Sequence, residues 1–393
     1  MSFEILETET RGTIIKVVGV GGAGGNAVQH MIARGVQGVE FICANTDHQA
    51  LARSSSKNIL QLGKTGLGAG SRPEAGRAAA EEARDRIADA LRGAHMVFIT
   101  AGMGGGTGTG AAPVFAEIAK ELGILTVAVV SKPFEFEGPK RLKLAESGVN
   151  QLEDTVHSLI VILNNKLEEV MGEDAEMAEC FRAADDVLHN ACAGIAEIIN
   201  VPGLVNVDFE DVKTVMSEQG KAMMGTALAS GLDRARIAAE QAVASPLLEG
   251  VDLSGARGVL VNITASSSLK MKETREVMNT IRAFAADDAT VIFGTVCDES
   301  IGDGLRVTVV ATGLGRAASR KQSTPFTVVR TGTDNAPMTV PVTSSHGSAS
   351  DYSDFEKPAI WRTRESAQTR VAAMEDTGSD RYDIPAFLRK QAD

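Results

Sequence analysis

The chemistry of this chain centres on a glycine-rich segment, Gly104–Gly110, with the sequence GGGTGTG. The segment follows an apolar run, Met96–Thr100, and precedes a helical pattern, Ala111–Leu122. Glycines let the backbone approach an anion closely, and a helix start offers unpaired N–H groups and the positive end of its dipole. The two threonines add hydroxyl donors. We therefore expect a phosphate-binding loop made of Gly104, Gly105, Gly106, Thr107, Gly108, Thr109 and Gly110.

A second glycine motif lies near the start of the chain. Gly19–Gly24 satisfies the pattern GxGxxG directly after an apolar run, and Asp47 follows at a position suited to the ribose-binding acid of a dinucleotide-binding fold. This motif leaves a dinucleotide-binding oxidoreductase open as an alternative. Two features count against it: such a fold does not need the second glycine segment, and no catalytic His or Lys is evident beside a substrate pocket.

An acidic segment, Asn206–Asp211, has the sequence NVDFED. One interpretation is structural, with Asp208 at the N-cap of a helix and Asp211 at its N3 position. The other is catalytic, with two carboxylates that polarise a water for attack on a phosphate. The residues alone leave both interpretations open.

The elements around these motifs alternate between strands and helices. Strands are expected at Ile14–Val20, Val39–Cys43, Met96–Thr100, Ile124–Val130 and Ser158–Leu163, a glycine loop at Gly21–Gly25, and helices at Asn26–Arg34, Ser71–Arg92 and Ala111–Leu122. This alternation predicts a parallel, doubly wound α/β sheet. In such sheets ligands bind at the carboxyl ends of the strands, which is where both glycine segments lie.

A long helix, expected at Phe181–Asn200 from its apolar spacing, separates this sheet from a second region. That region is expected to be a smaller α+β domain, with helices around Asp211–Met224 and at Lys272–Ala285 and strands at Gly258–Thr264, Thr290–Val296 and Leu305–Ala311. The predicted organisation is a flexible N-terminus (1–12), a nucleotide-binding domain (13–178), the central helix and its end (179–204), the C-terminal α+β domain (205–316), a disordered linker (317–380) and a terminal peptide (381–393).

The terminal peptide differs from the Ser-, Thr- and Pro-rich linker before it. Ile384, Phe387 and Leu388 would share one face of a short helix, with Asp383 as its cap. A short apolar anchor behind a flexible tether suggests a peptide that docks on a partner.

Composition excludes some classes of function. The formal net charge is −12, and residues 317–393 carry 10 basic and 10 acidic side chains, so the whole excess lies in residues 1–316. An acidic body argues against a nucleic-acid binder of the basic-patch kind. The four cysteines form no CxxC pair and the six histidines no HExxH pattern, so we expect reduced thiols and no protein-built metal site. With no signal peptide or membrane-spanning run visible, a cytoplasmic protein is expected, without direct membrane insertion.

Together, the two glycine segments, the NVDFED segment and the terminal Asp383–Leu388 resemble the FtsZ family, the tubulin-like cell-division GTPases of bacteria. The resemblance covers about residues 13–316 and resumes at the last dozen residues. It implies a tubulin-like GTPase fold and a protein that polymerises into the filaments of the division ring.

The resemblance also implies a nucleotide site. Asn26 would lie near the guanine, and Glu137 and Arg141 would hold the ribose and the neighbouring phosphate. Phe181 would stack on the base, and Asp185, one helical turn further on, would accept hydrogen bonds from its N1 and exocyclic amine. The nucleotide-binding residues implied are Gly21, Gly22, Asn26, Asn45, Gly104, Gly105, Gly106, Thr107, Gly108, Thr109, Gly110, Glu137, Arg141, Phe181 and Asp185.

By the same resemblance, the catalytic residues Asn206, Asp208 and Asp211 of one subunit would act on the GTP held by the next. Hydrolysis to GDP would then require head-to-tail assembly, with Mg²⁺ and K⁺ as cofactors. The implied partners are further copies of the chain and, through Asp383–Leu388, the membrane-associated division proteins FtsA and ZipA, at the inner face of the membrane at the division site. No nucleic-acid partner is implied.

Three positions depart from the family pattern, namely Asn165, Gln219 and Lys221. They leave turnover and filament stability open. A tubulin-like plasmid-segregation filament and a regulator that binds GTP without hydrolysing it remain as alternatives. The terminal peptide argues against the first, and the intact Asp208 and Asp211 against the second.

Overall fold

The computed structural model describes residues 12–172, 174–201, 203–218, 220–245, 256–286 and 289–314. The predicted linker, the terminal peptide, almost all of the predicted N-terminal segment and Gln219 lie outside these ranges. Within them the sheet topology is continuous, with the strand order β3-β2-β1-β4-β5-β6-β7-β10-β8-β9.

The first six strands of this order are all parallel to their neighbours, which confirms the predicted parallel sheet. They are β1 (Ile15–Val20), β2 (Val39–Asn45), β3 (Asn58–Gln61), β4 (Met96–Gly102), β5 (Leu125–Lys132) and β6 (Ser158–Leu163). Their order, 3-2-1-4-5-6, is also that of dinucleotide-binding folds. The direction of winding reverses between β1 and β4, so a ligand site is expected at the carboxyl ends of these two strands.

Both faces of this sheet are covered, because the β-branched strands are apolar on both sides. Ile15 and Val17 of β1 belong to the core on one face, together with α1 (Gly21–Ala33) and α8 (Met177–Asn200). Val18 and Val20 belong to the core on the other. The helices of that second face are α3 (Pro73–Glu82), α4 (Arg84–Leu91), α5 (Thr107–Glu121) and α6 (Pro139–Thr155).

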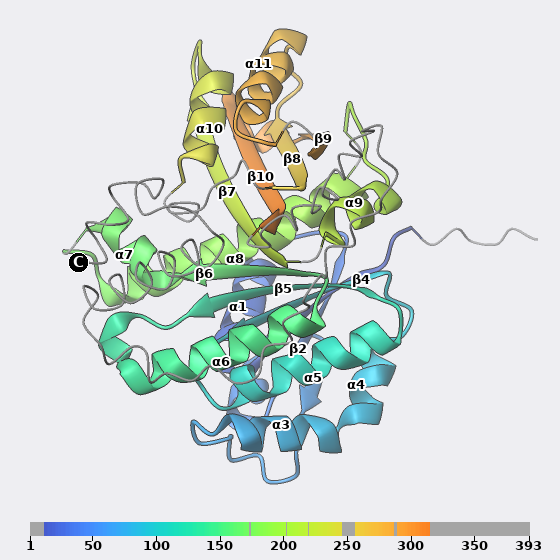
Figure 1. Cartoon of the computed structure of the whole chain (residues 1–393), viewed down its shortest axis with the longest axis vertical. Coiled ribbons are helices and arrows are strands. Elements are labelled where there is room, and N and C mark those ends of the chain that lie inside the picture. The colour runs from blue at the N-terminus through green and yellow to red at the C-terminus, as the bar shows by residue number, and fades with distance from the viewer. Residues whose placement is uncertain are drawn as a thin grey trace, which may run out of the picture. The chain divides into compact units, whose positions relative to one another are not determined.

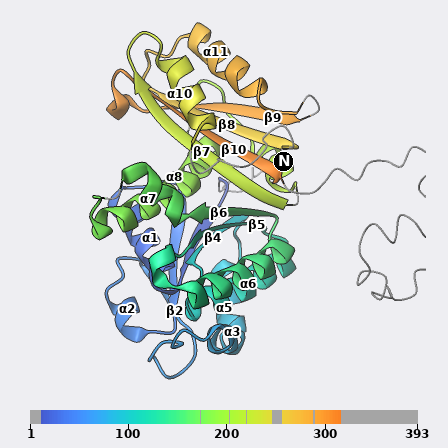
Figure 2. The same ribbon diagram turned by 60° about the vertical axis from the view of Figure 1, so that its left-hand side comes forward.

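The C-terminal strands extend the same sheet. β7 (Gly220–Ser230) pairs in parallel with β6, and β10 (Gly304–Leu314) lies antiparallel between β7 and β8 (Gly258–Ala265). β9 (Thr290–Cys297) completes the order beside β8. Figure 2 shows α10 (Arg234–Val243) and α11 (Met271–Arg282) packed on these strands, where they enclose a further core. The predicted α+β character of this region is confirmed.

Helix α8 connects the two groups of strands. The core that begins at Ile15 on β1 continues past Leu188 and Ile195 of α8 to Leu260 on β8 and Val310 on β10. In Figure 1, α7 (Asn164–Met171) and α9 (Phe209–Met216) lie at opposite ends of α8. Across the described ranges, no helix is both long and apolar enough to cross a membrane.

Several predicted boundaries were wrong. The glycine loop expected at 21–25 is the first turn of α1, and α5 starts at Thr107, inside the segment expected to be loop. The single helix expected at 71–92 is two helices, α3 and α4, that meet at Ala83. Glycine is a poor helix former in isolation, so a helix that starts on glycines is held there by tertiary packing.

The helix predicted around 211–224 was also wrong. α9 ends at Met216, and Gly220–Ser230 is the strand β7. This strand is rich in Gly, Ala and Met rather than β-branched residues, so its composition gives no strand signal. Its pairing with β6 and β10 determines its conformation.

Candidate functional site

A cavity of about 860 Å³ opens at the carboxyl ends of β1 and β4, at the expected switch point. Both glycine segments contribute to its wall. Of the predicted nucleotide-binding residues, those lining it are Gly21, Gly22, Asn26, Asn45, Gly105, Gly106, Thr107, Gly108, Glu137, Arg141, Phe181 and Asp185.

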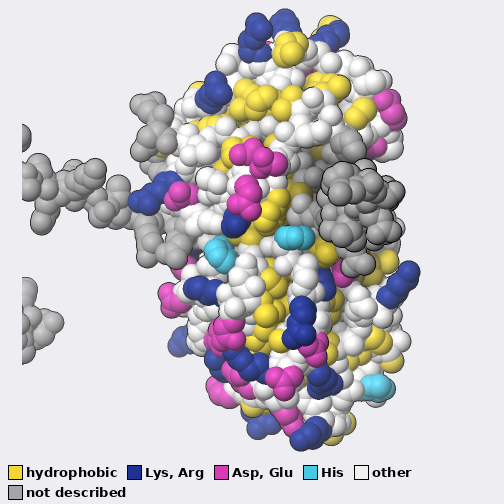
Figure 3. All heavy atoms as spheres, turned by 90° about the vertical axis from the view of Figure 1, so that its right-hand side faces the viewer, with side chains coloured by type: hydrophobic (Ala, Val, Ile, Leu, Met, Phe, Trp, Pro, Cys, Tyr) yellow, Lys and Arg dark blue, Asp and Glu magenta, His cyan; other side chains and the backbone are white. Residues whose placement is uncertain are grey.

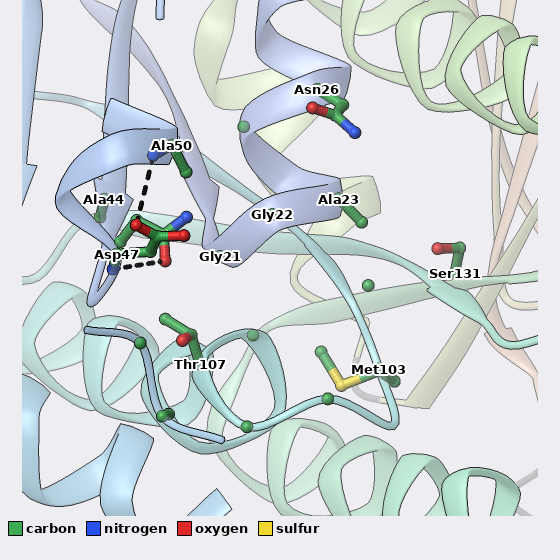
Figure 4. Close-up of a pocket in the computed structure, with 18 of the residues that line it drawn as sticks. Gly21, Gly22, Ala23, Asn26, Ala44, Asp47, Ala50, Met103, Thr107 and Ser131 are labelled. Atoms are coloured by element: carbon green, nitrogen blue, oxygen red, sulfur yellow. Dashed lines mark hydrogen bonds between the residues drawn. The ribbon is translucent and has the colours of Figure 1, made fainter. Parts of the chain in front are cut away.

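Two helix N-termini meet at the floor of this cavity. α1 begins at Gly21 and α5 at Thr107, and neither has a side-chain cap. The two starts lie so close that a Cβ on Gly21 would fall 2.9 Å from the backbone nitrogen of Gly108, and Gly21 has a φ of 78°. Figure 4 shows both helix starts beside the cavity. Uncapped N–H groups and two helix dipoles converge here, which suits a phosphate chain.

The loop after β2 forms another wall. The Thr46 and Thr107 hydroxyls are hydrogen-bonded, with 2.6 Å between the two oxygens. Asp47 caps α2 (His48–Ala52) by accepting from the N–H groups of Gln49 and Ala50, as Figure 4 shows in part. Both contacts use Oδ1, so Asp47 has a structural role as a helix cap while it also lines the cavity.

A pair of charged residues lies on the far side of the cavity. Arg141 forms an ion pair with Glu137, with 2.6 Å between Nη1 and Oε2. The other Glu137 oxygen accepts from the N–H of Phe134 at 3.0 Å, which fixes the carboxylate at the start of α6. Both side chains line the cavity, where the resemblance implies that they hold the ribose and a phosphate.

The first turns of α8 supply an aromatic ring and a carboxylate. Phe181 rests edge-on against Phe134, with ring centroids 5.2 Å apart, yet remains 43% exposed, so a face of its ring is available for stacking. Asp185 lies one turn further along and is half-buried. Burial raises the pKa of its carboxyl to about 6, with the charge of His30 opposing and that of Asp186 adding to the rise. The group is thus mostly ionised at neutral pH and can act as an acceptor.

Three residues of the GGGTGTG segment do not line the cavity. Thr109 is buried, and its hydroxyl accepts from the N–H of Gly104 at 2.9 Å, which closes the loop on itself. Gly110 faces α3, where a Cβ would fall 1.9 Å from the carbonyl oxygen of Pro73. These residues shape the loop and pack α5 against α3.

The predicted catalytic residues lie away from the cavity, beyond the other end of α8. Asp208 is the N-cap of α9, and its Oδ1 accepts from the N–H of Asp211 at 2.8 Å, which confirms the capping interpretation. Asn206 accepts from the N–H of Gly203 at 2.8 Å. All three side chains are exposed. Capping uses one oxygen of Asp208, so the structure does not exclude the catalytic interpretation.

Asn164, which was not among the residues predicted from the sequence, lines the cavity at the start of α7. Its side chain is 5% exposed, and its Oδ1 has no hydrogen-bond partner among the described residues. A buried acceptor of this kind is expected to meet a ligand or a water. The sequence feature that could have identified Asn164 is its position directly after β6, because several other cavity residues also follow the ends of strands.

Comparison with known proteins supplies the family. Residues 14–172 match the Tubulin/FtsZ family, GTPase domain, and residues 220–315 match the FtsZ family, C-terminal domain. The cell division protein FtsZ of Coxiella burnetii is 54% identical over an alignment of 393 positions that covers 99% of each chain. The protein of the same name from Azotobacter vinelandii is 52% identical over the full length of both chains. The chain belongs to the FtsZ family.

Solved FtsZ structures agree with this assignment. The FtsZ dimer of M. jannaschii is 42% identical and superimposes with a TM-score of 0.74 over 78% of this chain and 89% of that one. CetZ2 from Haloferax volcanii, at 21% identity and a TM-score of 0.65, shares the fold. As an FtsZ-family protein this chain is a cell-division protein with a tubulin-type GTPase domain, so the oxidoreductase alternative is excluded.

Two of the positions that depart from the FtsZ pattern have contacts. Asn165 accepts from the N–H of Glu135 at 3.0 Å and so ties the start of α7 to the loop before α6. Lys221 lies 3.9 Å from Glu153, and both side chains are partly exposed. The third, Gln219, lies outside the described residues.

Proposed function

We propose that this protein holds GTP in the cavity of one subunit and hydrolyses it with Asn206, Asp208 and Asp211 of the next. The observation that carries the proposal is the placement of these groups at opposite ends of α8. The last α8 residue that lines the cavity is Leu188 and the helix ends at Asn200, so at 1.5 Å per residue α8 runs on for about 18 Å beyond the cavity before the chain reaches the acidic segment. A single subunit therefore cannot bring its own acidic segment to its own nucleotide.

In this proposal the base lies between α1 and α8. Phe181 stacks on the guanine, Asp185 accepts from N1 and the exocyclic amine, and Asn26 lies on the opposite wall. Adenine has no donor pair in that arrangement, so an ionised Asp185 selects guanine. Glu137 and Arg141 hold the ribose and the adjacent phosphate.

The phosphates lie over the N-termini of α1 and α5, held by backbone N–H groups and the Thr107 hydroxyl. The described residues contain no cluster of three or more His, Cys, Asp or Glu side chains placed to hold a metal. We therefore propose that Mg²⁺ is held through phosphate oxygens and waters, where it neutralises charge that develops on the phosphates. K⁺ is proposed as the accompanying monovalent cation. Asp208 and Asp211 of the neighbouring subunit would orient and polarise the attacking water.

Exposed apolar side chains at both ends of α8 support a head-to-tail contact. Leu67 and Phe136, near the cavity, are 89% and 60% exposed, and Leu204, beside the acidic segment, is 75% exposed. Figure 3, which looks at the side of the molecule where Figure 1 shows α9, displays hydrophobic side chains in a central band. Such a contact joins unlike ends and does not close on itself, so it propagates into a filament. The solved FtsZ dimer of M. jannaschii supports association within the family.

The remaining proposals concern the segments outside the described residues. We propose that 317–380 is a tether and that 381–393 binds membrane-associated division partners of the FtsA and ZipA kind, which would hold the filament at the cytoplasmic face of the division site. The boundaries at 12, 178, 204 and 316 are proposed as domain limits. Deleting 381–393 should abolish partner binding and leave GTP hydrolysis intact.

Sedimentation with different nucleotides tests the proposed function. The protein should pellet with GTP and Mg²⁺ but not with ATP, and phosphate should be released by the pelleting samples. Hydrolysis of GTP by protein that stays in the supernatant would contradict the shared site.

A further inference from the structure

The part of the cavity assigned to the base is a slot between two helices. α1 contributes Asn26 and Gln29 to one wall, and α8 contributes Ala184, Asp185 and Leu188 to the other. The two helices must keep a fixed separation if both walls are to contact one planar base.

A cluster of titratable side chains lies directly behind this slot and joins its walls. His30, one turn after Asn26 on α1, donates from Nε2 to Oδ1 of Asp186 on α8 at 2.8 Å. Arg34, a further turn along α1, donates to the same oxygen at 2.6 Å. The ring of His189, one turn after Asp185, meets the His30 ring edge-on, with centroids 6.1 Å apart. None of these four side chains is among those that line the cavity.

We propose that His30, held by Asp186, is a positioning residue for guanine recognition: it fixes α1 against α8 and supplies positive charge beside the Asp185 carboxylate. The inference rests on the proposed function, because it assigns a support to the residue that would recognise the base.

The charges around Asp185 support this role. Burial raises the pKa of Asp185 to about 6; the charge of His30 lowers that pKa and the charge of Asp186 raises it. Arg34 is permanently charged and pairs with Asp186 at any pH near neutrality. Burial, the largest cause, lowers the pKa of His189 and so disfavours the charged form of that ring. Within the cluster, His30 is therefore the side chain whose positive charge lowers the pKa of Asp185.

The charge on His30 therefore affects the protonation of Asp185, and through it the recognition of guanine. Guanine recognition needs an ionised Asp185, since a protonated carboxyl presents a donor to the donor edge of the base. A positive charge on His30 opposes protonation of Asp185. It would therefore preserve binding of guanine nucleotides as the pH falls towards 6.

The test is the affinity for GDP, measured by calorimetry at pH 8 and pH 6 on the full-length protein. GDP lacks the γ-phosphate, so its binding is measured apart from hydrolysis. Two variants distinguish charge from packing: His30→Gln, which cannot be charged, and His30→Lys, which is charged at both pH values. His48→Gln is the control, because His48 bonds to Gln61 and is not among the residues lining the cavity. Thermal unfolding verifies that each variant is folded.

We expect His30→Gln to match the unmodified protein within about twofold at pH 8 and to bind GDP about fivefold more weakly at pH 6, as a rise of about one unit in the pKa of Asp185 would produce. His30→Lys should keep its affinity at pH 6. Equal losses in both variants at both pH values, or no loss in His30→Gln at pH 6, would overturn the inference. If the unmodified protein bound ADP as tightly as GDP, the proposed guanine site itself would be wrong.

Discussion

Asp185 and Asp208 lie towards opposite ends of α8: Asp185 lines the cavity from the third turn of the helix, and Asp208 caps α9, which follows the other end. The core along α8 is continuous from β1 to β8 and β10. The helix therefore acts as a rigid spacer between a nucleotide site and an acidic segment. Because the acidic segment and the nucleotide site lie apart within one subunit, hydrolysis by Asp208 would require a contact between subunits.

Substitutions in the acidic segment should separate catalysis from folding. Asn caps a helix as well as Asp does, so Asp208→Asn should change the free energy of unfolding by less than about 0.5 kcal/mol. Removing its charge, or truncating Asp211 to Ala, should lower GTP turnover by about 100-fold or more, the range typical of a lost general base. GTP binding and assembly should persist. Phosphate release and equilibrium binding, measured on the same preparations, provide the comparison.

Glu210 supplies the matched control for this experiment. It is exposed on the same first turn and pairs with Lys213, so Glu210→Gln should leave turnover within about twofold of normal. Similar losses in the Glu210 and Asp208 variants would indicate a general effect of charge at this end of the molecule and would count against specific catalytic carboxylates.

Alanine substitutions at two glycines of the phosphate-binding region should have different effects, one on nucleotide binding and the other on stability. A Cβ on Gly22 meets no atom within 4 Å and would point into open space beside the cavity. Gly22→Ala should therefore leave stability within about 0.5 kcal/mol while weakening nucleotide binding. A Cβ on Gly110 would fall 1.9 Å from the Pro73 carbonyl oxygen, so Gly110→Ala should lower the free energy of unfolding by about 3 kcal/mol or more.

Urea denaturation and GDP binding measured on both variants test this contrast. If Gly110→Ala were as stable as the unmodified protein, the packing role assigned to this glycine would be wrong. If Gly22→Ala bound GDP normally, the backbone at the start of α1 would not approach the phosphates as proposed.

His157 should make the fold sensitive to acid. Its Nδ1 accepts from the N–H of Thr126 at 3.1 Å, and burial, assisted by the charge of Lys120, lowers its pKa from the usual 6.5. The unfolded state therefore binds this proton more readily than the folded state. The stabilisation is fully present above pH 6.5 and is lost as the pH falls through the lower folded pKa.

His157→Asn keeps an acceptor near the position of Nδ1 but cannot titrate. Its free energy of unfolding should fall less steeply between pH 7 and pH 5 than that of the unmodified protein. Parallel pH profiles for the two proteins would show that another group controls the acid sensitivity.

Much of the site could be predicted because it consists of backbone at the ends of parallel strands. The β-branched run before Gly21 and the apolar run before Gly104 both indicate buried strands, and their carboxyl ends meet at the switch point. The role of Asp208 as a helix cap could also be predicted from the sequence, because the side chain, its spacing to Asp211 and the helix start form one local pattern.

The features of the fold and site that could not be predicted depend on tertiary contacts, which local sequence patterns do not indicate. Strand β7 is defined by its pairing with β6 and β10 rather than by its own residues. The helical start at Gly21 is held against Gly108, which is 87 positions further along the chain. The tie between His30 and Asp186 spans 156 positions, and neither residue belongs to a motif.

The most direct test of the shared site is phosphate release from GTP across a dilution series, with light scattering recorded on the same samples in Mg²⁺ and K⁺. Specific activity should be near zero in dilute protein and rise above a threshold concentration, and scattering should appear at the same threshold. Asp211→Ala should show the scattering threshold with little phosphate release. Turnover that stays proportional to protein concentration, without scattering, would contradict hydrolysis by residues from a neighbouring subunit.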